Sequence, residues 1–186
     1  MDLATQLAHL RADSDALLAA CLADPTAPVP SCPGWDRTAL LSHVGRIHRW
    51  AGGQLVCGPG ERIRINEVSA PEGADLTAEY ATGADRLIAL LTTMDLAATW
   101  PTWAGPQPGT FFPRRMTQEL VIHRRDADPA PIDPALGVDG VDEMLELFAP
   151  RIPADRFDGR RGSLHLHATD ADGEWLIQVA PDGITF

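Results

Sequence analysis

Residues 110–127, TFFPRRMTQELVIHRRDA, are the stretch on which the predicted fold and the predicted chemistry both depend. Four apolar residues recur at the three- to four-residue spacing of one helix face: Phe112, Met116, Leu120 and Ala127. Glu119 and His123, four residues apart, fall on or beside the same face. Burying an unpaired carboxylate is costly, so Glu119 needs a cation, a proton or a hydrogen-bond donor beside it.

Three further segments of the chain show the helical period. Leucines spaced by three, four and seven predict a helix over residues 2–23, and similar stripes predict helices over 35–51 and 74–96. Gly52-Gly53 is expected to end the second of these, and residues 54–72 to form an exposed connection. A loop rich in Pro and Gly precedes residue 110. Four such helices predict a mainly α fold, an antiparallel four-helix bundle over residues 1–130.

The pattern changes after residue 130. A short helix is predicted over residues 138–149, followed by alternating segments at 163–168 and 175–179 with an Asp182-Gly183 turn. Residues 131–186 are therefore expected to form a short α+β domain.

Composition excludes several classes of protein. The chain has 186 residues, 45% of them apolar, and a formal net charge of −11 with no lysine. Such an acidic chain is not expected to bind nucleic acid. No segment is apolar enough for a signal peptide or a membrane span. The three cysteines, Cys21, Cys32 and Cys57, form no CxxC pair, so a disulfide framework is not expected. A cytoplasmic location is therefore expected.

A candidate metal site emerges from two of the predicted helices. His43 lies on the apolar stripe of the second helix, three residues after Leu40 and four before Ile47. A bundle can bring it opposite Glu119 and His123, and helical bundles build core metal sites in this way. Two histidines and one carboxylate leave a coordination position open, as in catalytic zinc, and they also suit non-haem Fe(II).

Plainer interpretations of these residues stay open. Glu119 and His123 at this spacing can be an ordinary surface pair, or Arg115 can neutralise Glu119. His43 can be a hydrogen-bonded core histidine. Arg46 and Arg115 lie one turn from the candidate ligands, where they can hold an anionic substrate or act as solvated helix charges.

The remaining candidates are predicted to have no chemical role. His165 and His167 share one face of a strand that is expected to be solvated. His9 and His48 are expected on helix surfaces. Cys32, just before a helix, is assigned a structural role, although a helix N-terminus can lower the pKa of a thiol.

Two separated motifs are distinctive: VPSCPGW at 29–35 with LLSHVGRIHRWA at 40–51, and FPRRMTQELVIHRRDA at 112–127. Both resemble segments of the mycothiol-dependent maleylpyruvate isomerase family. The resemblance implies a DinB-like bundle holding a divalent metal, usually zinc, through His43, Glu119 and His123. It extends to residues 138–144 and 162–169, which look like the start of the family's C-terminal domain. That domain is expected to be shortened here.

The resemblance implies thiol chemistry at the metal, with mycothiol as cofactor or cosubstrate and a small electrophile, possibly anionic, as partner. In an isomerase the thiolate adds to a conjugated double bond, allows rotation, and leaves. In an S-transferase the thioether is released. The alternatives are a metal-dependent hydrolase or lyase that uses water, and a non-catalytic bundle that binds a metal or small ligand. The lysine-free composition and the mycothiol link together suggest an actinobacterial source.

Overall fold

Four long helices form the N-terminal part of the fold. A computed structural model describes residues 1–186, except for the side chain of Ala154. The helices are α1 (Leu3–Ala23), α2 (Arg37–Cys57), α3 (Leu76–Thr93) and α4 (Phe111–Ala127). Asp2, Asp36 and Asp75 cap the first three, each accepting a backbone N–H of the first turn. Such caps satisfy donors that a helix start leaves unpaired.

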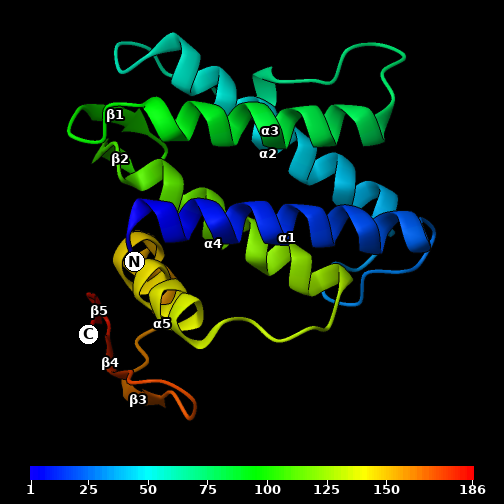
Figure 1. The fold of residues 1–186 in the computed structure, drawn as a ribbon. Helices are drawn as coiled ribbons and strands as arrows, with labels where there is room; N and C mark the ends of the chain where they lie inside the picture. The colour runs from blue at the N-terminus through cyan, green and yellow to red at the C-terminus, as the bar shows by residue number, and fades with distance from the viewer. The chain divides into compact units, whose positions relative to one another are not determined.

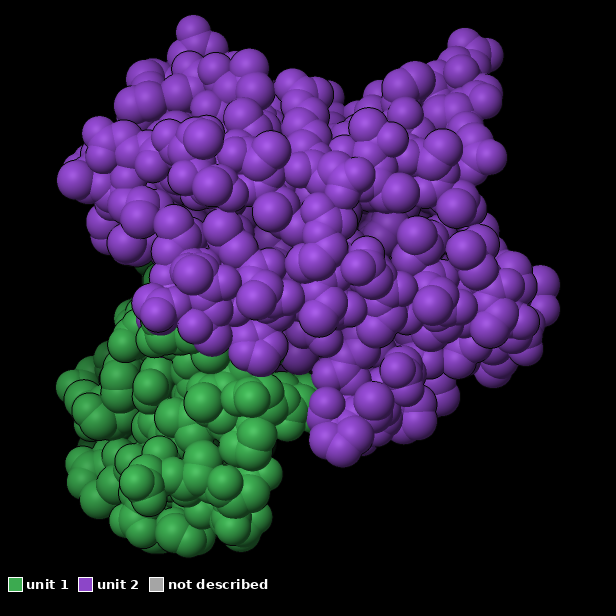
Figure 2. Space-filling model, in the orientation of Figure 1, with its two compact units in different colours: residues 1, 132–186 green, residues 2–131 purple. Residues whose placement is uncertain are grey.

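The helices pack as the predicted four-helix bundle. Helix α1 packs chiefly against α4, and α2 against α3, which Figure 1 shows as two neighbouring pairs. Leucines from α1, α2, α3 and α4 fill the core with Phe112, each 0–1% exposed: Leu10, Leu17, Leu40, Leu87, Leu91 and Leu120. Residues 2–131 form one compact unit, drawn in purple in Figure 2.

The prediction that Gly52-Gly53 ends the second helix is wrong. Helix α2 continues to Cys57 and ends at Gly58, whose φ of 82° suits glycine. A glycine inside a helix costs about 1 kcal/mol relative to alanine, but packing compensates for it here. A Cβ on Gly53 would lie 3.3 Å from Ile63 Cδ1, so this glycine allows the following segment to approach the helix closely.

Most of residues 54–72 are exposed, as predicted, although α2 takes in residues 54–57 and part of the segment after it folds back along that helix. The buried side chain of Gln54 accepts a hydrogen bond from the Ile63 backbone and donates one to the Glu61 carbonyl. The Trp50 indole donates to the Ile63 carbonyl at 2.9 Å. A short 3-10 turn, Ile65–Glu67, follows.

The predicted loop before α4 is a β-hairpin. Strands β1 (Thr99–Thr102) and β2 (Gly105–Pro108) pair in antiparallel register, and Thr102 pairs with Gly105. Proline and glycine are poor strand residues, so the sequence pattern concealed the hairpin. Burial favours it, because Trp100 is 4% exposed and packs edge-on against Phe112 with ring centroids 5.5 Å apart.

The second compact unit comprises Met1 and residues 132–186. Helix α5 (Pro134–Glu143) starts earlier than predicted, because Asp133 caps it and proline suits its first turn. A π-helical turn, Met144–Phe148, continues it. Strands β3 (Gly162–His167), β4 (Glu174–Ala180) and β5 (Gly183–Thr185) form an antiparallel sheet in sequential order. The core of this unit contains Leu145, Ala149 and Ile177.

Candidate metal centre

Three side chains from two helices converge in the bundle. His43 on α2 and Glu119 and His123 on α4 each offer one ligand atom, and these atoms lie within 4.8 Å of one another. Glu119 Oε1 lies 3.2 Å from His123 Nε2 and 3.9 Å from His43 Nε2. The three predicted ligands are thus brought together, since the period of each helix turns them toward the helix opposite.

The environment of Glu119 favours its ionised form. Burial opposes ionisation, but hydrogen bonds from His123 and His43 and the adjacent Arg115 guanidinium outweigh it. The pKa of Glu119 is therefore held far below its usual range. Arg115 does pair with Glu119, as the plainer interpretation suggested, yet the two histidines remain beside the same carboxylate. The negative charge of the Glu119 carboxylate can therefore interact both with Arg115 and with a metal cation held by the histidines.

His123 lies between two carboxylates. Its Nε2 faces Glu119, and its Nδ1 lies 3.0 Å from Asp126 Oδ2. Burial lowers the pKa of His123, but hydrogen bonding and charge from Glu119 and then from Asp126 outweigh this effect and raise it. In the doubly protonated ring, the two N–H groups face the two carboxylates, Nε2–H toward Glu119 and Nδ1–H toward Asp126.

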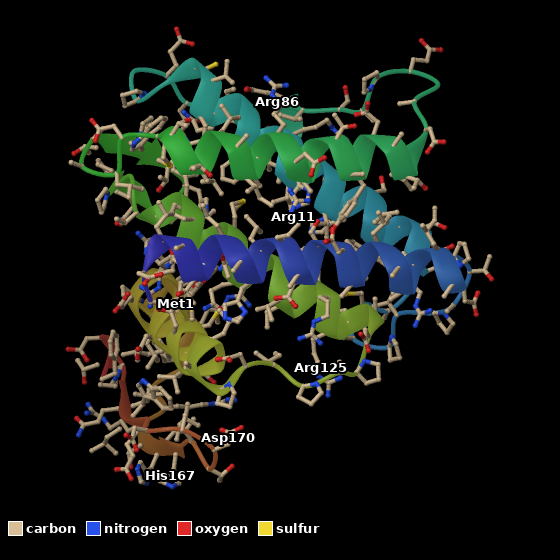
Figure 3. All side chains as sticks on the ribbon, in the orientation of Figure 1. Met1, Arg11, Arg86, Arg125, His167 and Asp170 are labelled. Atoms are coloured by element: carbon tan, nitrogen blue, oxygen red, sulfur yellow. The ribbon has the colours of Figure 1, made fainter. Side chains whose placement is uncertain are left out.

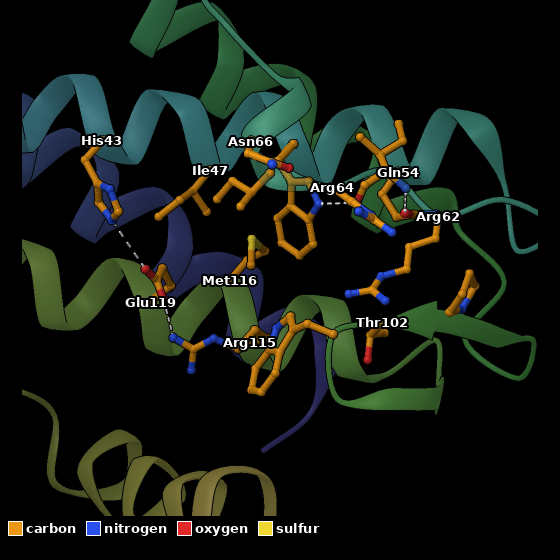
Figure 4. A pocket seen from close by; sticks show the side chains of 15 residues that line it. His43, Ile47, Gln54, Arg62, Arg64, Asn66, Thr102, Arg115, Met116 and Glu119 are labelled. Atoms are coloured by element: carbon orange, nitrogen blue, oxygen red, sulfur yellow. Dashed lines mark hydrogen bonds and ion pairs between the residues drawn. The ribbon is translucent and has the colours of Figure 1, made fainter. Parts of the chain in front are cut away.

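A cavity of about 520 Å³ opens beside these ligands within the bundle unit. His43 and Glu119 lie at one end of it, as Figure 4 shows. Its apolar lining includes Ile47, Trp50, Trp103 and Met116. Arg62, Arg64 and Arg115 also line it, and the Arg62 side chain reaches into the space in Figure 4. The cavity therefore suits a small molecule with an apolar body and a negative charge.

Sequence reasoning found only part of this lining. Arg115 lines the cavity as expected, whereas Arg46 is exposed and is not among the lining residues. The cavity face of α2 follows positions 43, 47, 50 and 54, and residue 46 is turned away from that row. Arg62, Arg64 and Trp103 were missed because they lie in segments read as loops. The alternation of Arg62 and Arg64 with apolar residues was a sequence signal that could have identified these two arginines as a pair on one side of the segment.

The other histidines and Cys32 have no place among the ligands. His48 was predicted on the surface, yet it is 3% exposed and packs on Tyr80, with ring centroids 5.1 Å apart. Burial lowers its pKa to about 4. His165 and His167 are exposed, as predicted, and pair with Glu174 (Figure 3 labels His167). The Cys32 thiol lies 3.9 Å from Asp126 Oδ2.

The donor set fits a divalent transition metal. Two imidazoles and one carboxylate are the ligands of many catalytic zinc centres, and they suit Fe(II) equally. Among the described residues, no other cluster of three or more potential ligands meets these distances. No helix in the described part of the chain has the length and hydropathy needed to cross a membrane.

Comparison with known proteins agrees with this architecture. A crystal structure of a mutant of mycothiol-dependent maleylpyruvate isomerase is similar to this chain, with a TM-score of 0.62 and 16% sequence identity. The match covers 94% of this chain and 80% of that chain, and at this identity it shows the fold. Comparison with curated proteins gives no match. The family model described as "Mycothiol maleylpyruvate isomerase N-terminal domain" matches residues 7–128, and the chain belongs to that family.

Proposed function

We propose that this chain is a metal-dependent enzyme that uses mycothiol to isomerise a small conjugated electrophile bearing an anionic group. The observation that carries the proposal is the convergence of His43, Glu119 and His123 at the end of a cavity large enough for a small molecule. Family membership supports the thiol, because the family's description names mycothiol and an isomerase.

The ligand residues would hold the metal as two neutral imidazoles and one carboxylate. When bound, a divalent metal such as zinc would act as a Lewis acid and lower the pKa of a thiol placed in its open coordination position. Glu119 would contribute the negative charge. Arg115, which pairs with Glu119, would keep that carboxylate oriented while its own charge faces the cavity.

The cavity residues would bind and orient the electrophile. Arg62, Arg64 and Arg115 supply positive charge in a chain whose net charge is −11, so an anionic group would find its partners here. Trp50, Met116 and their apolar neighbours would exclude water from the reacting double bond. The thiol would supply a nucleophile that adds reversibly to that double bond.

Zinc content and turnover test the proposal together. We expect protein purified without chelator to contain about one divalent ion per chain, and to isomerise a cis-configured unsaturated keto acid only when mycothiol is present. His43→Ala should lose the ion and the activity, because only two ligands remain. His165→Ala is the matched control, since it removes an exposed histidine far along the chain and should change neither quantity.

The products separate this proposal from its alternatives. Accumulation of the thioether instead of the isomer would identify an S-transferase. Turnover without any thiol would identify a hydrolase or lyase. Stoichiometric metal with no turnover and no mycothiol binding by calorimetry would indicate a non-catalytic metal-binding bundle. Any of these results would contradict the proposal that the chain is an isomerase.

A further inference from the structure

Asp126 is bonded through both of its carboxylate oxygens. It lies three residues after His123 on α4, and its side chain is 13% exposed. One oxygen, Oδ2, lies 3.0 Å from His123 Nδ1, and the other accepts a hydrogen bond from the Ser31 hydroxyl at 2.5 Å. The carboxylate thus joins α4 to a turn that lies 95 residues earlier in the chain.

The bond to Asp126 selects which nitrogen of His123 carries the hydrogen. An ionised carboxylate can only accept hydrogen bonds, so the imidazole presents Nδ1–H to it. The lone pair of the neutral ring then lies on Nε2, the nitrogen that is 3.2 Å from Glu119 Oε1. Asp126 therefore turns the ligand nitrogen of His123 toward the other two ligands.

The turn that holds Asp126 also contacts the second histidine. Residues 29–35 fold on themselves through backbone bonds between Val29 and Trp35 and between Cys32 and Val29. Trp35 packs against His43 with ring centroids 5.0 Å apart. One short turn therefore reaches His43 directly through Trp35, and reaches His123 through Ser31 and Asp126.

We propose that Asp126 is a positioning residue, anchored by Ser31, that fixes the tautomer and ring orientation of His123 so that Nε2 is presented to the metal. This inference rests on the proposed metal site. The inference assigns a role in that site to the turn at residues 29–35, since Trp35 packs on His43 and Ser31 holds Asp126 beside His123. Carboxylate partners of this kind typically change metal affinity 10- to 100-fold.

Metal affinity, measured by competition with a chromophoric zinc chelator, tests the inference without requiring a substrate. Asp126→Ala should raise the zinc dissociation constant about 10- to 100-fold. Asp126→Asn should recover part of this loss, because its amide oxygen can still accept the Nδ1–H bond. Ser31→Ala should have a smaller effect. Asp75→Ala is the matched control: it removes a carboxylate that caps α3, which carries no ligand, and should leave zinc affinity unchanged.

The orientation itself can be measured in the unsubstituted protein. Long-range ¹H–¹⁵N spectra of the zinc-loaded chain should show His123 protonated at Nδ1 and metal-bound at Nε2. Metal on Nδ1 overturns the inference whether or not Asp126→Ala folds. Unchanged zinc affinity in a folded Asp126→Ala also overturns it. His43→Ala separates the two claims: if it too leaves zinc binding intact, the proposed metal site has failed.

Discussion

The two compact units differ in how extensively they bury charged and polar side chains. The bundle unit, residues 2–131, buries Arg124, Gln54 and His48 to 4% exposure or less. The C-terminal unit buries Glu143 to 2% exposure, but its strand histidines His165 and His167 remain exposed beside Glu174. Burying such groups costs free energy unless partners satisfy them. The bundle has the larger apolar core, whose burial can offset that cost, and it is the unit that contains the candidate metal centre.

Breaking a buried ion pair of the bundle should have the largest effect. Arg124 donates to Asp13 at 2.9 Å and to the carbonyls of Ala130 and Pro131. Arg124→Met would leave Asp13 and these carbonyls without the cation, so we expect a loss of about 3–5 kcal/mol in the free energy of unfolding. Denaturant titration measures it.

An exposed ion pair provides the control for this experiment. Arg11 and Asp85 lie 2.7 Å apart, and their side chains are 41% and 69% exposed. Arg11→Met should cost less than about 1 kcal/mol. If Arg124→Met and Arg11→Met lowered the free energy of unfolding equally, burial would not make the Arg124–Asp13 pair more important than the exposed Arg11–Asp85 pair.

Truncating one apolar residue in each core compares the units directly. Leu87 is 0% exposed and Ile177 is 8% exposed. Leu87→Ala should cost about 2–5 kcal/mol, the usual range for a buried cavity. Ile177→Ala should cost less, about 2 kcal/mol, because the small core around Ile177 lies close to solvent and can collapse around the gap. Denaturant titration of both variants checks the order, and a larger loss for Ile177 would reverse the comparison.

Acid should destabilise the bundle through His48. Its pKa is about 4 in the folded chain and 6.5 in the reference state. Between these values the unfolded chain binds a proton that the folded chain excludes, so stability falls as the pH drops from 6.5 to 4. The expected loss is about 3 kcal/mol.

The pH dependence of His48→Gln isolates this effect. Carboxylates also titrate in acid, so the quantity to compare is the difference between this variant and the unsubstituted chain. That difference should change by about 3 kcal/mol between pH 7 and pH 4. A constant difference would show that His48 accepts its proton without a penalty.

The smallest effect is expected on the outer face of the C-terminal sheet. Glu174 lies 2.9 Å from His167, but the side chains are 64% and 58% exposed. Glu174→Gln should therefore change the free energy of unfolding by less than about 1 kcal/mol. A thermal melt at neutral pH measures it, and a loss as large as that of Arg124→Met would remove the contrast between the units.

Much of the bundle was predictable because its signals are local. Apolar residues at helical spacing located α1, α3 and α4 to within a few residues, and two facing stripes singled out His43, Glu119 and His123. The errors arose where local preference conflicts with packing. Gly52-Gly53 disfavours a helix and the residues at 99–108 disfavour strands, yet contacts with distant residues stabilise both elements.

The sequence by itself determined the helical periodicity, the acidic charge and the residue types that can bind a metal. The tertiary structure alone decided which side chains meet. It brought Arg62 and Arg64 to the cavity, turned Arg46 away from it, buried His48, and joined Ser31 to Asp126 across 95 residues. Periodicity places a residue on one face of its own helix, whereas its partners depend on how that helix packs against segments far away in the chain.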